Sequence, residues 1–318
     1  MSRTVLVWVS LAATIATGQP TQKFFERKKP SAGVPFAWPS TWADVSNTSI
    51  TRPNILRFLK DLDRDNVPQM LTDIQSFRFV PLEKDRFYMV ADVDASANGF
   101  FGDLQIVRCD RAACIVGNEL TVAEDLETDL VDVDLDGVFE VITKESPGFR
   151  TRSTYGSPPF VYAIKSLVRG EFVDVSAKYS DYFKSHILAR MEADRKAMES
   201  DIANVDRSPV VLSNQELKIE LQYVQDDYHR RVLGERTAGL DNALKWARSD
   251  DEALREFGVK ALEPVDSSVA AAELLRIANT GQPGGPGHAS ASDDARNALL
   301  RRAQKRLAPP PANGAKKH

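Results

Sequence analysis

The segment LVDVDLDGVFEVIT, residues 130–143, is the stretch that decides how this chain folds. Apolar residues alternate with other residues on both sides of its centre, which is the two-residue period of half-buried β-strands. In the centre, carboxylates recur at Asp132, Asp134 and Asp136, and Gly137 follows directly. Glycine accepts a sharp backbone turn without steric cost. The segment therefore predicts two strands joined by a tightly curled acidic loop.

The same pattern extends in both directions, over residues 77–175. Short runs rich in β-branched and aromatic residues are separated by turn signals, among them FRFVPL, RFYMVADV, DLQIVRC, FVYAIKSLV and EFVDVS. Arg169 and Gly170 stand between the last two runs, where they indicate a tight hairpin. We therefore predict a β-rich block of antiparallel strands over residues 76–176.

After residue 176 the apolar residues follow a helical period. Phe183, Ile187 and Met191 are spaced by four, which predicts one long amphipathic helix over residues 179–205. Capping boxes that begin at Ser213 and Ser249 predict further short helices, packed as stacked pairs. Before the β block, ILRFLKDL and MLTDI in residues 54–76 also have helical spacing. The fold class is therefore α+β: an antiparallel β-sheet domain followed by an all-α helical domain.

The chain divides into five parts on these patterns: a signal peptide (1–18), an extended and partly helical lead-in (19–75), the β-rich domain (76–176), the helical domain (177–279), and a flexible linker with a short basic helix and tail (280–318). Arg3 precedes an apolar run over residues 5–16, and Ala16 and Gly18 are the small residues of a cleavage site. The alternative is that this run forms the first buried element of the fold. We expect a periplasmic or secreted protein with no transmembrane segment after signal removal, since the run is shorter than the ~20 residues of a membrane span.

The two cysteines support export. Cys109 and Cys114 are separated by four residues between two β-branched runs, which suits a hairpin whose strands bring them within bridging distance. A disulfide fits an oxidising compartment. Two free buried thiols, or a redox pair, are the alternatives, although the C-x-x-C spacing of a thioredoxin-like site is absent.

Charge is distributed unevenly along the 318 residues. The formal net charge of −4 argues against a nucleic-acid partner. Residues 60–140 hold nineteen acidic and seven basic residues, and an acidic β block of this kind attracts cations. From Ser292 onward there are seven Lys or Arg residues and two Asp. Such a tail can contact acidic lipid, nucleic acid or the acidic block, but solvated tails usually bind nothing specific.

The acidic loop has the spacing of a calcium site, D-x-D-x-D-G-x-x-E. Calcium takes six to eight oxygen ligands at about 2.4 Å, and alternate side chains on a curled loop converge on one point. An EF-hand is excluded, because Thr143 occupies the position of its last ligand and the flanking segments are strands. A merely acidic surface turn is the alternative. Two weaker acidic segments lie at residues 61–69 and 92–99.

With its flanking strands, this loop resembles the calcium loop of FG-GAP/VCBS repeats, the blades of integrin-α-type β-propellers. The phrase GEFVDVSAKYSDYF, residues 170–183, is similar to blade-closing segments of secreted bacterial proteins of that kind. The resemblance covers about residues 75–180 and implies a structural Ca²⁺ ion. The implied ligands are the side chains of Asp132, Asp134, Asp136 and Glu140 and the carbonyl of Val138. The segment suffices for about two blades and a propeller needs four or more, so we expect a small open or sandwich-like sheet capped by the helices.

Catalytic signatures are absent from the sequence. It contains no G-x-S-x-G, no phosphate-binding G-x-x-x-x-G-K-[ST], no H-E-x-x-H and no dinucleotide-binding G-x-G-x-x-G. We therefore expect a binding or structural protein rather than an enzyme, calcium-stabilised and exported, that presents its sheet and helices to a protein or glycan partner. One alternative is a metal- or carboxylate-dependent glycan hydrolase. The other is a helical partner-binding scaffold in which the β block is a spacer.

Overall fold

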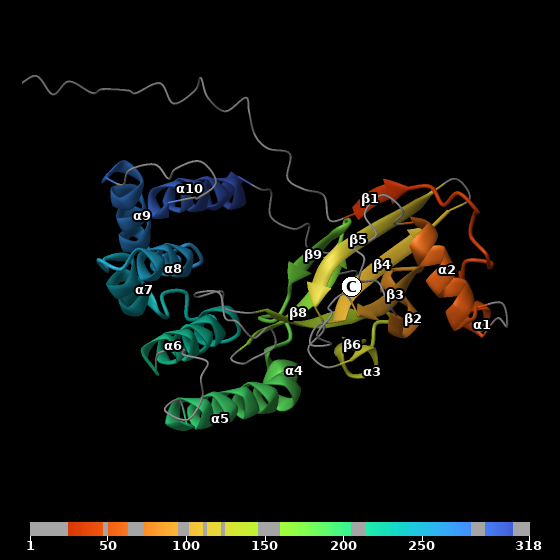
Figure 1. Cartoon of the computed structure of the whole chain (residues 1–318), viewed down its shortest axis with the longest axis horizontal. Helices are drawn as coiled ribbons and strands as arrows, with labels where there is room; N and C mark the ends of the chain where they lie inside the picture. Colours follow the sequence, from red (N-terminus) through yellow and green to blue (C-terminus); the bar gives the residue numbers. More distant parts are fainter. Residues whose placement is uncertain are drawn as a thin grey trace, which may run out of the picture.

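The structure is a computed structural model that describes residues 25–46, 50–62, 73–94, 102–110, 113–121, 125–145, 160–204, 214–280 and 290–307. The predicted signal peptide lies outside these ranges, as do most of the acidic segments 61–69 and 92–99, the predicted linker and the C-terminal tail. The described residues form antiparallel sheets followed by helices, which confirms the α+β fold class (Figure 1).

The first sheet has five antiparallel strands in the order β1-β5-β4-β3-β2. The strands are β1 (Phe25–Lys28), β2 (Asp73–Glu83), β3 (Arg86–Asp94), β4 (Gly102–Cys109) and β5 (Cys114–Thr121). Strands β2 to β5 form an up-and-down meander. Strand β1 pairs with β5 and comes from the region predicted as an extended lead-in, so that region contributes an edge to the sheet.

The second sheet has four antiparallel strands in the order β6-β7-β8-β9: β6 (Leu130–Val131), β7 (Glu140–Glu145), β8 (Val161–Val168) and β9 (Glu171–Asp174). The short helix α3 (Leu126–Asp129) precedes β6. The predicted hairpin between β8 and β9 is present, with both Arg169 and Gly170 at positive φ. Positive φ at both central residues gives the type I′ geometry that matches the twist of paired strands.

The two sheets share a hydrophobic core, as expected for a sandwich-like arrangement. Alternate residues of each strand face opposite sides, so one face of each sheet contributes to this core. It includes Val80, Val90 and Ile106 from the first sheet and Val141 and Leu167 from the second. The neighbouring residues point the other way: Phe79 and Met89 reach the core on the outer side of the first sheet, and Ile142 and Ile164 reach the core on the outer side of the second.

Helices α1 (Trp42–Val45) and α2 (Arg52–Leu62) lie beside the first sheet (Figure 1). Helix α2 buries Ile55, Phe58 and Leu59 in the outer core of that sheet. The disulfide between Cys109 and Cys114 closes the β4–β5 hairpin in the same core, where the two Cα atoms are 4.0 Å apart. The predicted bridge is therefore present.

The outer face of the second sheet packs against a helical run and then α6 (Asn214–Arg231). The run predicted as one helix consists of α4 (Ser180–Tyr182), the π-helical turn η3 (Phe183–Ile187) and α5 (Leu188–Asn204). Phe183 and Ile187 are fully buried against the sheet, as their spacing predicted. The π turn adds a residue to the local period, and such turns occur mostly inside α-helices.

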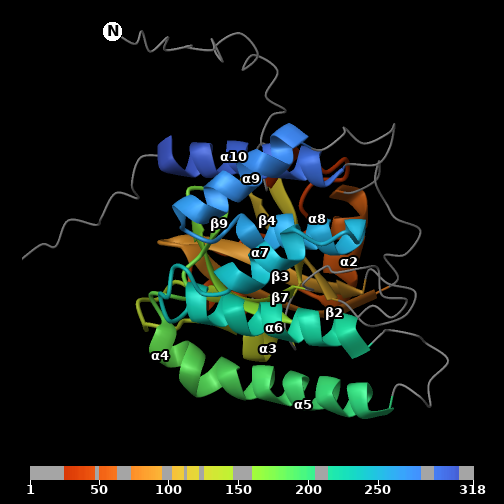
Figure 2. The same cartoon turned by 90° about the vertical axis from the view of Figure 1, so that its left-hand side faces the viewer.

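The remaining helices form a separate core at the far side of the molecule (Figures 1 and 2). They are α7 (Leu240–Ala247), α8 (Glu252–Leu262), α9 (Ser268–Thr280) and α10 (Ala291–Leu307). Helix α7 packs mainly on α8 and α9 mainly on α10, which agrees with the expected helix pairs. Because Ala291, Ala295 and Ala298 are buried in this core, the helical unit extends past residue 279, where the sequence predicted its end.

Two local predictions are wrong. Residues 73 and 74 of the MLTDI segment begin strand β2 rather than a helix, because the buried Ile74 pairs with β3 and tertiary pairing outweighs its spacing. The cap of α8 is Asp251, whose carboxylate accepts the Leu254 N–H, whereas the Ser249 hydroxyl accepts the N–H of Asp251 in the preceding turn.

Within the described ranges, none of the helices combines the length and apolar character needed to span a membrane.

Candidate metal site

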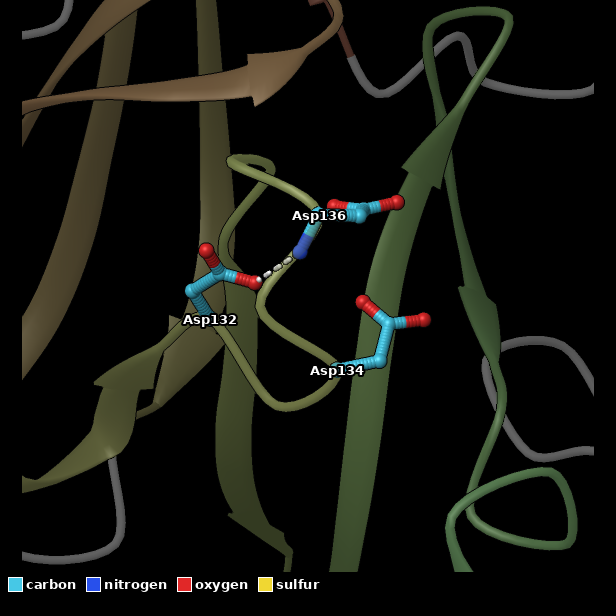
Figure 3. Close-up of side chains that lie close together, drawn as sticks. All are labelled: Asp132, Asp134 and Asp136. Atoms are coloured by element: carbon cyan, nitrogen blue, oxygen red, sulfur yellow. Dashed lines mark hydrogen bonds between the residues drawn. The ribbon is translucent and has the colours of Figure 1, made fainter.

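The acidic loop joins β6 to β7, and it brings three carboxylates together. Asp132, Asp134 and Asp136 each offer an oxygen, and these oxygens lie within 4.8 Å of one another. Asp132 is half-buried and the other two are exposed. Figure 3 shows the three side chains converging from one turn of the loop. The convergence predicted from the D-x-D-x-D spacing is therefore present.

Backbone hydrogen bonds to the first and third carboxylates hold the loop in this shape. Asp132 accepts the N–H groups of Asp136 at 3.0 Å and Gly137 at 2.9 Å (Figure 3 draws the first). Asp136 accepts the N–H of Val138 at 2.9 Å. Gly137 has φ +87°, as the sharp turn requires, and Leu135 adopts φ +59° without being a glycine. The loop thus keeps an uncommon backbone conformation at Leu135 to bring the carboxylates together.

The end of the loop is anchored to the first sheet. The Phe139 N–H donates to the carbonyl of Pro81 on β2 at 2.8 Å. The Arg78 guanidinium lies 5.5 Å from the centroid of the Phe139 ring, and the Trp42 ring lies 5.9 Å from it. Since both sheets and the lead-in contact this point, the position of the loop depends on the packing of the whole β part.

Asp134 has two partners on the segment that leads into α4. Its Oδ2 accepts from the Tyr179 hydroxyl at 2.8 Å and from the Lys178 ammonium at 3.0 Å. Lys178 also contacts the Tyr179 hydroxyl, and its ammonium lies over the Tyr179 ring. Burial raises the pKa of Asp134, but the hydrogen bonds from Lys178 and Tyr179 outweigh it and hold the pKa below its ordinary value. The Asp134 carboxylate is therefore charged at neutral pH.

Glu140, the fourth predicted side-chain ligand, does not join the cluster of three. It is buried, and its Oε1 accepts from Ser166 at 3.0 Å and from Tyr179 at 3.1 Å. Its Oε2 accepts the Val133 N–H at 3.2 Å. Burial raises the pKa of Glu140, and it does so more strongly than these donors lower it. Glu140 therefore acts as a buried acceptor that fixes the base of the loop.

Tyr179, Lys178 and Ser166 are the site residues that the sequence reasoning missed. Tyr179 and Lys178 belong to the GEFVDVSAKYSDYF segment that carries the resemblance, but loop spacing gives no signal for residues 44 and 45 positions away from Asp134. The role of the Val138 carbonyl as a calcium ligand stays a prediction. The N–H of Val138 donates to Asp136 within the loop.

The donor chemistry of the cluster fits calcium. A carboxylate has about four lone-pair sites, so one backbone hydrogen bond to an oxygen leaves room for a cation on that oxygen. Asp134 Oδ2 already accepts from both Lys178 and Tyr179, so the three carboxylates offer up to five oxygens. Calcium takes six to eight hard oxygen ligands in flexible geometry, and water commonly supplies some of them. No nitrogen or sulfur ligand is in the cluster, which counts against zinc and copper.

In comparisons with known proteins, no family model, no curated protein and no solved structure matches this chain.

Proposed function

We propose that the loop of residues 132–140 binds one Ca²⁺ ion, and that this ion stiffens the β part of an exported protein that binds a protein or glycan partner. The observation that carries the proposal is the convergence of the Asp132, Asp134 and Asp136 carboxylates within 4.8 Å. The resemblance of the same loop to FG-GAP/VCBS repeats supports it, because calcium has a structural role in those blades.

Electrostatics favours a bound cation. Like unit charges at this separation repel by on the order of 3 kcal/mol near a protein surface. Within the described part of the chain, the cation paired with this cluster is Lys178, which contacts Asp134 alone at 3.0 Å and whose side chain is 60% exposed. One solvated ammonium offsets only part of three negative charges. A divalent ion at the cluster would therefore remove the remaining repulsion between the three carboxylates.

A structural role for this ion is better supported than a catalytic one. Glu140, the nearest second acid, is buried, and its two oxygens already accept three hydrogen bonds. A glycosidase needs two carboxyl groups facing each other across a cleft, ~5–9 Å apart. The loop contributes no lining residue to the cavity beside α7, α9 and α10 or to the cavity between the second sheet and helices α6 and α8.

Export is supported by two independent features. The N-terminal sequence has the order of a secretory signal: Arg3, an apolar run and small residues before Gln19. The disulfide between Cys109 and Cys114 fits an oxidising compartment. In such a compartment free calcium reaches about 1 mM, and extracellular calcium modules bind at ~10⁻⁴–10⁻³ M.

The test is thermal unfolding in calcium and in chelator. With a Kd of about 0.1 mM and about 1 mM free calcium, linkage gives about 1.4 kcal/mol of stabilisation, a shift of a few degrees in Tm. Asp134→Asn should abolish the shift. Asp85→Asn is the matched control: Asp85 is exposed on the β2–β3 turn at φ +58°, which Asn also tolerates, so this variant should keep the full shift. An unmoved wild-type curve would overturn the proposal.

A further inference from the structure

A polar cavity lies between the second sheet and the helices. Its volume is about 290 Å³. The sheet contributes Glu145, Lys165 and Asp174 to its lining, and helices α6 and α8 contribute Asp227, Arg231 and Lys260, with Tyr223 and two small apolar residues beside them. Ligand sites occur preferentially at such junctions between structural units.

The charged side chains around this cavity balance one another. The cations Lys165, Arg231 and Lys260 face the carboxylates Glu145, Asp174 and Asp227. Lys165 pairs with Glu145 at 2.6 Å, and Arg231 pairs with Asp174 at 2.6 Å and Asp227 at 2.8 Å. The lining therefore has no net charge to attract an ion of either sign.

Arg231 makes one wall of the cavity rigid. Besides the two carboxylates, its guanidinium donates to the Ser176 hydroxyl at 3.3 Å and to the carbonyl of Tyr162 on β8. Asp227 is also held by Arg230 at 2.9 Å. These contacts fix the shape of the cavity and use the donors of Arg231. The carboxylates keep further lone pairs and the Lys165 ammonium keeps further N–H groups, which a ligand can reach.

Tyr223 contributes a hydroxyl to the lining of this cavity. Tyr223 is half-buried, and its ring packs against Phe257 with centroids 5.2 Å apart. Its hydroxyl makes no hydrogen bond within the described residues and is not among their fully buried polar atoms, so it is accessible to a molecule in the cavity. Burial and the nearby Asp227 raise the pKa of Tyr223 to about 12, so the hydroxyl stays protonated and can both donate and accept.

We propose that this cavity binds a neutral polyhydroxylated ligand, a single sugar residue, with the Tyr223 hydroxyl as a contact. A charged ligand would gain little, because the charges of the lining balance one another. A sugar hydroxyl both donates and accepts hydrogen bonds, so it can bond to the cations and to the carboxylates of this lining. Val161, Ala163 and the Tyr223 ring offer apolar surface to the C–H groups of a sugar ring. The cavity volume is at the lower end of the range for ligand pockets. It fits a single sugar unit rather than an enclosed oligosaccharide. This inference rests on the glycan partner of the proposed function but does not require the calcium loop.

Ligand-observed NMR with the full chain tests this inference. The probes are glucose, galactose, mannose and N-acetylglucosamine, each at up to about 100 mM, which is well above a millimolar Kd. Glycine and acetate serve as zwitterionic and anionic probes. We expect at least one sugar to bind, and we expect Tyr223→Phe to weaken it about tenfold, or 1.4 kcal/mol. Tyr228→Phe is the matched control, because Tyr228 is on the same helix and lines neither cavity.

Three results would overturn the inference: no sugar binds, glycine or acetate binds at the cavity in place of a sugar, or Tyr223→Phe binds as tightly as the wild type. Tyr223→Phe keeps the ring that packs on Phe257, so the variant should fold, and its melting curve verifies this. The same titrations with calcium and with chelator separate the two proposals. A calcium-dependent Tm without sugar binding contradicts the sugar site alone, and sugar binding without a calcium effect contradicts the calcium loop alone.

Discussion

Tyr179 connects the acidic loop to the helices through a single hydroxyl, which contacts both Asp134 and the buried Glu140. Tyr179→Phe keeps the ring and removes these contacts, so Glu140 loses one of its three donors. We expect the free energy of unfolding to fall by about 1–3 kcal/mol in urea. Tyr182→Phe, three residues further on, is the control, since the Tyr182 ring stacks on His186 and the variant should change stability by less than about 0.5 kcal/mol. Equal stability of the two variants would contradict this role of Tyr179.

Glu273 is a buried carboxylate of the helical core whose charge state should affect stability. It is 5% exposed and accepts hydrogen bonds from Arg248 and Arg276. The hydrogen bond from Arg248 is the largest of the effects that lower the pKa of Glu273 to about 2. A lowered pKa stabilises the fold above the pKa of the unfolded chain, and this stabilisation is lost as the pH falls toward the folded value.

Glu273→Gln should therefore destabilise the protein at pH 7 by about 1–2 kcal/mol, a figure reduced by the solvent exposure of both arginines. The difference from wild type should shrink between about pH 4.5 and pH 2. Urea unfolding followed by far-UV circular dichroism at pH 7 and pH 3 measures it. A difference that stays constant over this range would show that Glu273 acts through packing and not through its charge.

At the scale of elements, α7 and α8 approach each other closely at Gly258. A Cβ atom added at Gly258 would lie 2.1 Å from the backbone nitrogen of Ala247. Gly258→Ala should force the two helices apart and cost more than about 3 kcal/mol, or prevent the core from folding. Gly234→Ala is the comparison, since an added Cβ meets nothing within 4 Å there and only its φ of +77° opposes alanine, at about 1–2 kcal/mol. Similar melting temperatures for the two variants would contradict the packing of α7 on α8.

The β4–β5 hairpin carries the disulfide, and its loop is short. For a ring of this size the chain-entropy relation gives about 2 kcal/mol, at the low end of the range for disulfides. Reduction should therefore lower the Tm of the β part by several degrees, and non-reducing alkylation followed by mass spectrometry should find no free thiol. Full labelling of both cysteines in protein isolated without reductant would contradict the bridge.

The sequence predicted best those elements that depend on neighbouring residues. The β8–β9 hairpin followed from Arg169 and Gly170, the bridge from the spacing of Cys109 and Cys114, and the core face of η3 from Phe183 and Ile187. The pairing of β1 with β5 could not be predicted, because strand partners 86 to 92 residues apart leave no local pattern. The same reason applies to the site: the convergence of Asp132, Asp134 and Asp136 is local, whereas the contact of Tyr179 with Asp134 depends on how the second sheet meets the helices.

At the scale of the whole molecule, Arg231 joins the second sheet to the helices. It lies at the end of α6 and bonds to Asp227 on its own helix, to Asp174 at the end of β9 and to the backbone of β8. Arg231→Met retains much of the side-chain volume but leaves the mostly buried Asp227 with Arg230 as its remaining guanidinium partner. We expect a loss of about 3–5 kcal/mol, typical of breaking a buried ion pair.

The same variant should reduce the cooperativity between the two parts. Thermal unfolding followed by near-UV circular dichroism, for the β part, and by far-UV circular dichroism, for the helices, should then give two transitions at different temperatures. The wild type should give a single transition by both signals. Arg236→Met, which removes a longer ion pair of 3.7 Å between exposed side chains, is the control and should keep the wild-type transition. One unchanged transition in Arg231→Met would contradict the role of Arg231 as the junction.

The central claim is that the loop of Asp132, Asp134 and Asp136 holds one calcium ion, and isothermal titration calorimetry of the metal-free full chain with calcium tests it most directly. The account predicts about one ion per chain with a Kd of about 0.1–1 mM, no binding to Asp134→Asn, and wild-type binding to Asp85→Asn. Magnesium should bind more weakly, because it requires a tight octahedron that a flexible loop does not impose. The absence of calcium binding to the wild type, or equal binding to Asp134→Asn, would contradict the claim.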